Sequence, residues 1–146
     1  MQLSLLLIRL YNFLKKNKVL FVYFPLVIYW ITIFIATSIP LDQIPQLFDF
    51  QDKLEHFAAY FILAILISFT FHFQEKYYFL KNRVILFAIL TLTIYAAFDE
   101  LHQLLIPGRV ADITDWIADV IGGVLGIIFS NLFIKIGLTQ FNIVNE

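Results

Sequence analysis

The chain has 146 residues, of which 61% are hydrophobic and only 14% are charged. A soluble domain usually carries about a quarter charged residues, so this composition excludes an ordinary soluble fold and predicts one domain in a lipid bilayer. The chain has no cysteine, which excludes disulfides and thiolate metal sites.

The N-terminal part of the chain predicts a surface helix followed by a membrane span. Residues 1–18 mix leucines and aromatics with basic side chains, which is typical of an interfacial helix on the cytoplasmic face. Val19–Ser38 has no charged residue and is long enough to cross about 30 Å of hydrocarbon. Ile39–Gln51 contains two prolines and predicts a loop.

Three further spans are predicted at Asp52–His72, Val84–Ile106 and Asp115–Gly137, joined by short loops. Residues 19–137 therefore form the transmembrane domain, and residues 138–146 are predicted to be a cytoplasmic tail. The expected fold class is an all-α integral membrane four-helix bundle. The Gly122-x-x-x-Gly126 pattern in the last span predicts close approach of another helix.

The basic residues predict an orientation with both termini inside. That orientation puts 8 of the 10 Lys and Arg on the inner side. Only Lys53 and Arg109 then lie outside, where most of the acidic residues gather. These acids are Asp42, Asp49, Asp52, Glu55, Asp99, Glu100, Asp112, Asp115 and Asp119.

Polar residues at three helix ends have helical spacing. Because residues three or four apart share one side of a helix, each set is expected to form a stripe. Ionisable groups in membrane helices normally face a bundle interior or a water-filled cavity, so the stripes are expected to converge on one polar site. The three stripes are Asp52, His56 and Tyr60; Asp99, His102 and Gln103; and Asp112, Asp115 and Asp119.

These residue types suit several kinds of chemistry. Carboxylates with imidazole bind divalent metals, and a histidine beside a carboxylate acts as a general base. An arginine holds a phosphate or carboxylate in a bidentate grip. The predicted catalytic residues are His56, Asp99, Glu100 and Asp115. The predicted ligand-binding residues are Asp52, Lys53, Tyr60, Gln103, Arg109 and Asp119, and the identity of any metal is left open.

Structural roles explain some of the same residues. Asp52 and Asp112 are good N-cap residues, and Arg109 is a candidate to pair with Asp99, Glu100 or Asp115. For His56, Asp99 and Asp119, which sit deeper in apolar sequence, a functional or buried-network role is favoured. No phosphate-binding loop, nucleophile elbow or HExxH motif occurs, so an enzymatic activity rests on co-location alone.

Two of these segments resemble the signatures of VanZ-like membrane proteins. The first is Asp52-Lys53-Leu54-Glu55-His56-Phe57-Ala58-Ala59-Tyr60-Phe61, preceded by Thr37-Ser38-Ile39-Pro40. The second is Asp99-Glu100-Leu101-His102-Gln103, then Pro107-Gly108-Arg109, Asp115 and Gly122. The resemblance covers about residues 25–130. One position departs from it, because Asp119 stands where the family usually has Asn.

The resemblance implies a multi-pass protein of the bacterial cytoplasmic (inner) membrane. The family is named for an accessory protein associated with reduced sensitivity to teicoplanin. The first hypothesis is therefore binding of a lipid-linked or cell-envelope molecule at the outer face. The alternative is a metal-dependent intramembrane hydrolase or transferase acting on lipid phosphate headgroups. A proton-coupled transporter is less favoured, because the inner half of the spans offers little polar path.

The expected partner is the lipid bilayer, with a lipid-linked envelope precursor as the candidate ligand. No nucleic-acid partner is predicted. The sequence leaves open whether copies of the chain associate into a homo-oligomer and whether the protein confers any resistance.

Overall fold

The computed structural model describes residues 2–145, with side chains described for residues 5–40 and 42–139. The chain is 81% helical and has no strand in this part. Four helical stretches are long and apolar enough to cross a membrane, which confirms the predicted all-α fold with four spans: Val19–Thr37, Gln51–Phe73, Val84–Gln103 and Ile113–Thr139. The helices are α1 (Gln2–Lys16), α2 (Phe24–Thr37), α3 (Gln51–Phe73), α4 (Tyr78–Asn82), α5 (Val84–Gln103) and α6 (Ile113–Asn145).

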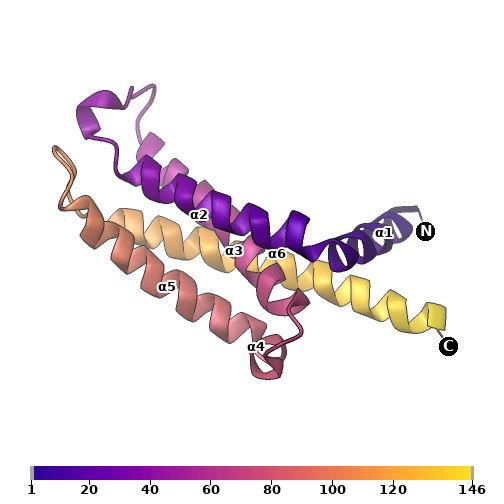
Figure 1. Ribbon diagram of the computed structural model, residues 1–146. Coiled ribbons are helices and arrows are strands. Elements are labelled where there is room, and N and C mark those ends of the chain that lie inside the picture. The colour runs from indigo at the N-terminus through magenta and orange to yellow at the C-terminus, as the bar shows by residue number, and fades with distance from the viewer. Residues whose placement is uncertain (1, 146) are drawn as a thin grey trace.

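A π-helical stretch joins the first two helices. It covers Val19–Tyr23 and ends just before Pro25. Proline lacks the backbone N–H and its ring crowds the carbonyl four residues earlier, so a locally wider helix accommodates it. Figure 1 shows α1 and α2 following one another in nearly the same direction, with α1 beside the C-terminal part of α6. The surface position expected for residues 1–18 stays a prediction.

Helices α3 and α6 form the central pair of the bundle and share its most extensive contact. The close approach depends on two glycines of α6. A Cβ atom on Gly122 would collide with the backbone carbonyl of Phe57, and one on Gly126 with that of Phe61. The predicted role of the Gly122-x-x-x-Gly126 pattern is therefore confirmed, because no larger residue lets the two backbones come this close.

The core lies along the middle of α3, where α2, α5 and α6 pack around it. Large apolar side chains cover the outside; Val19 is 68% exposed and Ile94 69% exposed. Such a surface is stable only against lipid. The buried apolar residues of this core are Leu26, Ile33, Tyr60, Leu63, Ala64, Ile67, Ala88, Leu92, Ala96 and Ile127.

Two helix ends and one additional short helix differ from the sequence-based expectation. Helix α5 ends at Gln103 and not at Ile106. The next residues form a turn, in which Leu105 N–H donates to His102 O and Ile106 N–H donates to Gln103 O. Pro107 disfavours helical geometry at the residue before it, which explains the earlier end. Helix α6 continues through the predicted tail to Asn145, and α4 adds one turn within the loop expected at residues 73–83.

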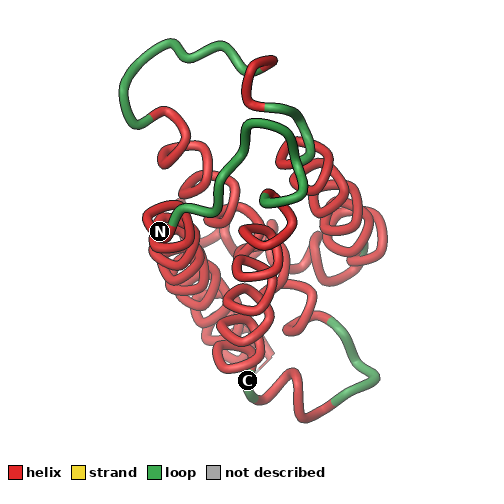
Figure 2. Tube along the Cα trace, turned by 90° about the vertical axis from the view of Figure 1, so that its left-hand side faces the viewer, coloured by secondary structure: helices red, strands yellow, loops and turns green. Residues whose placement is uncertain are grey.

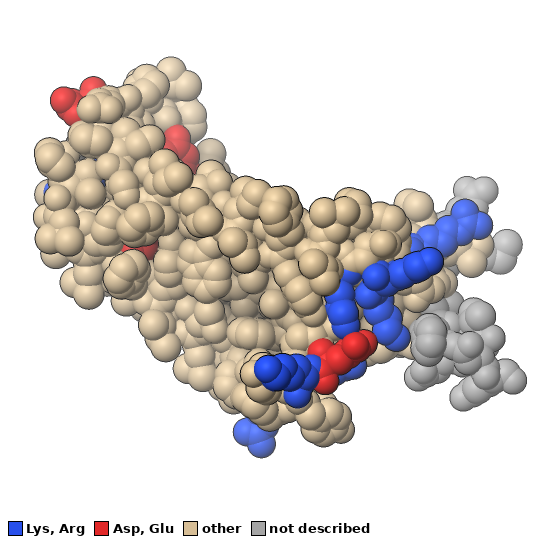
Figure 3. All heavy atoms as spheres, viewed as in Figure 1, with Lys and Arg blue, Asp and Glu red and all other residues tan. Residues whose placement is uncertain are grey.

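The two ends of the bundle carry opposite charges. We call the end where α2 and α5 finish and α3 and α6 begin the acidic end, and the opposite one the basic end. Figure 3 shows blue side chains gathered toward the basic end and red ones mainly toward the acidic end. At the basic end Glu75 pairs with Lys18 at 2.8 Å, and this bond holds the pKa of Glu75 below its ordinary value. Which end faces the cytoplasm stays a prediction.

Candidate functional site at the acidic end

The first feature of the acidic end is a group of ion pairs around one lysine. Lys53 Nζ, near the start of α3, lies 2.9 Å from Asp52, 3.2 Å from Asp112 and 2.9 Å from Asp115. The lysine thereby links the first turn of α3 to the start of α6. Asp52, Lys53 and Asp115 were predicted site residues, and the structure joins them in a closed charge cluster.

The capping predictions have different outcomes for the two aspartates. Asp112 Oδ1 accepts a hydrogen bond of 2.8 Å from the backbone N–H of Thr114, so Asp112 does cap α6. This bond and the Lys53 ammonium lower the pKa of Asp112 to about 2. Asp52 is not an N-cap, because α3 is preceded by Phe50 in the left-handed conformation with φ 62°, and Asp52 lies inside the first turn.

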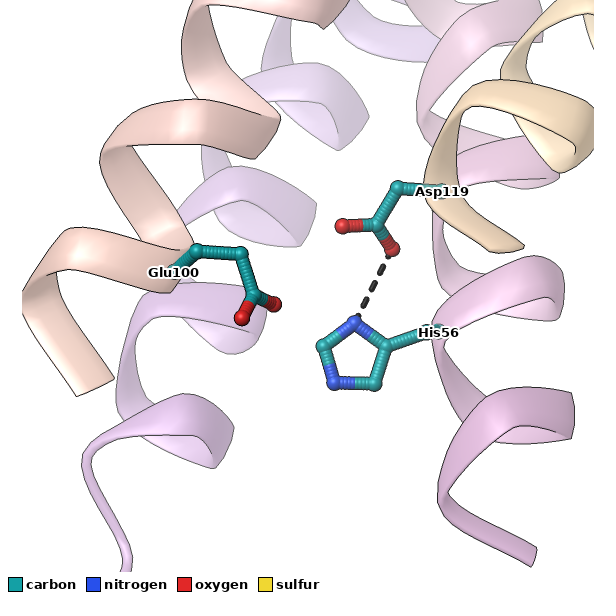
Figure 4. Close-up of side chains that lie close together, drawn as sticks. All are labelled: His56, Glu100 and Asp119. Atoms are coloured by element: carbon teal, nitrogen blue, oxygen red, sulfur yellow. Dashed lines mark hydrogen bonds and ion pairs between the residues drawn. The ribbon is translucent and has the colours of Figure 1, made fainter. Parts of the chain in front are cut away.

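A second group of polar side chains follows about one helical turn further along α3 and α6, and Figure 4 shows its three members. His56 Nδ1 of α3 is 3.0 Å from Asp119 Oδ1 of α6, and Glu100 of α5 faces both. One potential ligand atom from each of the three residues lies within 4.8 Å of the others. All three side chains are buried, with Asp119 fully inaccessible. Glu100 Oε2 also accepts a hydrogen bond of 2.8 Å from the backbone N–H of Asp112.

A third group surrounds Asp99, which is 1% exposed. Thr37 Oγ1 at the end of α2 donates a hydrogen bond of 2.8 Å to Asp99 Oδ1. Nearby side chains of the predicted stripes, Tyr60 and Gln103, are also buried. Several polar atoms at this end have no hydrogen-bond partner in the described part of the chain: Tyr60 OH, Asp99 Oδ2, Glu100 Oε1, Gln103 Nε2 and Asp119 Oδ2. Since buried polar groups are nearly always satisfied, this concentration marks a candidate site.

Arg109 does not pair with a carboxylate, contrary to one of the sequence interpretations. Its Nε and Nη2 donate to the backbone carbonyls of Ile39, at 3.1 Å, and Ala36, at 3.4 Å. The carbonyls at the C-terminal end of a helix carry partial negative charge, so a guanidinium is well placed there. Arg109 thus ties the α5–α6 loop to the end of α2 and retains a positive charge that no described carboxylate neutralises by an ion pair.

A cavity of about 370 Å³ opens among these groups. Helices α2, α3 and α5 form its walls, together with the loop between α2 and α3 and Arg109 from the loop before α6. Figure 2 views the molecule from this end and shows those loops in green. The polar lining residues are Thr37, Gln43, Asp52, Glu55, His56, Tyr60, Asp99 and Arg109, and the apolar ones are Ile33, Ala36, Ile39, Ile44, Pro45 and Ala59.

The structure brings most of the predicted residues to this end but divides them among separate groups. His56 belongs both to the cavity lining and to the second group with Glu100 and Asp119. His102, placed in a stripe by its spacing, instead contacts the rings of Phe34 and Phe98, at centroid distances of 4.6 Å and 6.4 Å. Its neighbour Glu100 faces the site.

Sequence reasoning did not assign to the site Thr37, although Thr37 stands in the resemblance, or the loop residues that close the cavity, Gln43, Ile44 and Pro45. The signals for Thr37 were its place in the Thr37-Ser38-Ile39-Pro40 segment of the resemblance and its position as a hydroxyl residue at the end of an apolar span. The loop residues carried none, because their contribution depends on how the chain folds back between α2 and α3.

Four helices that are long and apolar enough to cross a membrane define a multi-pass membrane protein. The VanZ/LLP1 family matches residues 14–134, which is most of the chain. The chain therefore belongs to the VanZ/LLP1 family. A search of curated proteins and a search of solved structures each gave no match.

Proposed function

We propose that the cavity at the acidic end binds the headgroup of a lipid-linked or other cell-envelope molecule at the outer face of the bacterial cytoplasmic membrane. The observation that carries this proposal is a cavity of about 370 Å³, lined by both polar and apolar side chains, at the end of membrane-spanning helices. Binding sites of this size are typically apolar with a few placed polar groups. A headgroup that remains attached to its acyl or prenyl chain offers a polar and an apolar part to such a mixed lining.

The charges of the lining favour a headgroup that carries both signs. Arg109 supplies a cation, while Asp99 and Glu55 supply carboxylates. A purely anionic group would meet the carboxylates, and a purely cationic one would meet the guanidinium. A phosphate beside Arg109 with an ammonium or several hydroxyls toward Asp99 satisfies both, because charge-assisted hydrogen bonds are the stronger ones.

Native mass spectrometry of the detergent-purified protein tests this proposal. Phosphatidylethanolamine is the probe with both charges, and phosphatidylglycerol and undecaprenyl phosphate are the anionic comparisons. We expect retention of phosphatidylethanolamine to fall about tenfold or more in Arg109→Gln and in Asp99→Asn, as expected for loss of a charged contact worth about 1.5–3 kcal/mol. Arg83→Gln, which removes an exposed arginine at the basic end, is the matched control. Equal retention in all variants would refute the proposal.

A cellular effect follows from the family resemblance. If the protein alters the accessibility of an envelope precursor, expression in a susceptible host should raise the inhibitory concentration of teicoplanin. Asp99→Asn should lose this effect while the protein remains in the membrane. An unchanged teicoplanin response, with lipid binding intact, would separate ligand binding from resistance.

A second candidate function is metal-dependent hydrolysis or transfer at a lipid phosphate headgroup. One observation favours it: the group of His56, Glu100 and Asp119 lies next to the cavity and shares His56 with it. An imidazole that binds the metal cannot take up a proton at the same nitrogen, so with His56 as a ligand the candidate general base is Asp99, which lines the same cavity. Asp115, the other predicted catalytic residue, is held by Lys53 and is less suited to direct chemistry. Release of phosphate from undecaprenyl pyrophosphate, with and without added Mn²⁺ or Zn²⁺, tests this function.

A further inference from the structure

The second polar group has a geometry of its own, separate from the cavity contacts of Asp99 and Arg109. Its three side chains come from three different helices, α3, α5 and α6, so tertiary packing alone brings them together. His56 is 9% exposed, Glu100 7% and Asp119 0%. In Figure 4 the carboxylates of Glu100 and Asp119 both point toward the imidazole of His56.

The charges in this group are not balanced by described side chains. Asp119 Oδ1 is bonded to His56 and Glu100 Oε2 to a backbone N–H, but Asp119 Oδ2 and Glu100 Oε1 have no partner in the described part of the chain. Lys53 is held by three other aspartates. Two buried carboxylates thus face one imidazole, and burying carboxylates without a counter-charge is expensive.

We propose that His56, Glu100 and Asp119 bind a divalent transition-metal ion such as Zn²⁺ or Mn²⁺. One imidazole nitrogen and two carboxylate oxygens are ligands for these ions, whereas Mg²⁺ and Ca²⁺ prefer oxygen ligands alone. Bonds of about 2.0–2.2 Å bring ligand atoms to roughly 3.3–4.2 Å from one another, depending on geometry. The present separations, all within 4.8 Å, need only small side-chain rotations to reach that arrangement.

Three protein ligands leave at least one coordination position for another molecule, as in catalytic rather than structural metal sites. Because His56 also lines the cavity, that position lies close to where a headgroup would bind. The metal site explains why three buried ionisable groups meet inside a membrane bundle. Metal binding does not depend on which headgroup the cavity accepts, so the metal-site proposal and the headgroup proposal can be refuted separately.

Cobalt titration of the purified protein is the direct experiment. The protein is stripped with EDTA in lipid-free detergent and titrated with Co²⁺, whose visible absorption reports nitrogen and oxygen ligands. We expect one equivalent of Co²⁺ per chain, displaced by Zn²⁺. Separate Mn²⁺ titrations followed by electron paramagnetic resonance should give the same stoichiometry. Absence of stoichiometric binding by the wild-type protein in both titrations would overturn the proposal.

Variants identify the ligands. Asp119→Asn and Glu100→Gln keep the shape of each side chain and should weaken metal binding at least about 100-fold. That loss exceeds the one usual for residues that only hydrogen-bond to a metal ligand. Glu75→Gln is the matched control, because Glu75 is an exposed carboxylate at the basic end, away from both the cavity and this group. Wild-type affinity in both ligand variants would overturn the assignment. Lipid retention measured in EDTA separates this result from failure of headgroup binding.

Discussion

Helix α3 carries a buried histidine near each of its ends, and the two have opposite surroundings. His72 at the basic end is hydrogen-bonded to Tyr11 at 2.9 Å and contacts the ring of Phe73. His56 at the acidic end faces two carboxylates with unpartnered oxygens. The first is a hydrogen-bonded pair in contact with aromatic rings, and the second is a group of ionisable side chains beside a cavity. Burial of a histidine therefore indicates function only where its neighbours remain unsatisfied.

The largest effect is expected from Gly122→Leu, which would disrupt the packing of α6 against α3 beside His56. The new side chain would meet the backbone of Phe57, one residue from His56. We expect a loss of more than about 3 kcal/mol of stability, because a backbone cannot move aside cheaply. Melting curves in detergent would show the loss of stability, and size-exclusion chromatography would show aggregation. Gly123→Ala is the control, since its Cβ meets only the Leu92 side chain at 3.4 Å.

Tyr11→Phe tests the basic end. It leaves the buried His72 without its described side-chain partner, which should cost about 1–3 kcal/mol of stability. Burial raises the pKa of Tyr11, so its hydroxyl stays protonated and the loss should not vary from pH 6 to 8. Melting temperature measures the loss. Headgroup and Co²⁺ binding should stay at wild-type levels, and a parallel loss of either would show that the ends are not independent.

Asp99→Asn should have the opposite effect at the acidic end. Asn keeps an oxygen that accepts the Thr37 hydrogen bond and removes a buried carboxylate with an unpartnered oxygen. We expect a gain of about 0.5–2 kcal/mol in stability together with weaker headgroup binding, the usual trade at functional sites. Thermal melting and lipid retention would be measured on the same preparation. A destabilised variant would mean that Asp99 is a structural residue like Tyr11.

The smallest effect is expected from Asp112→Asn, which keeps the cap but removes the charge facing Lys53. Asp112 has a pKa of about 2 in the folded protein, below its ordinary value of 3.8. Its ionised form therefore stabilises the fold fully above about pH 4, and this contribution is lost as the pH falls through 2. The melting-temperature difference between wild type and variant should be constant from pH 8 to 5 and shrink in stronger acid. A difference that changes between pH 6 and 8 would assign the effect to another group.

The spans were predictable because each depends on a local property, a continuous apolar run of sufficient length. The polar site was only partly predictable, because helical spacing does not reveal which side of a helix faces its neighbours. Asp99 and Gln103 turned out buried as their spacing predicted. Glu100, one residue from Asp99, also faces the bundle, since α5 contacts α2, α3 and α6 at once. His102 contacts phenylalanine rings instead.

The sequence by itself determined the number of spans, the segregation of charge between the two ends and the small-residue pattern that permits close packing. Each follows from neighbouring residues along the chain. Only the tertiary structure decided that Lys53 holds three aspartates, that Arg109 bonds backbone carbonyls and that His56 meets Asp119, 63 positions away. These partnerships depend on the relative rotation and depth of α3, α5 and α6, which the packing at Gly122 and Gly126 helps to set.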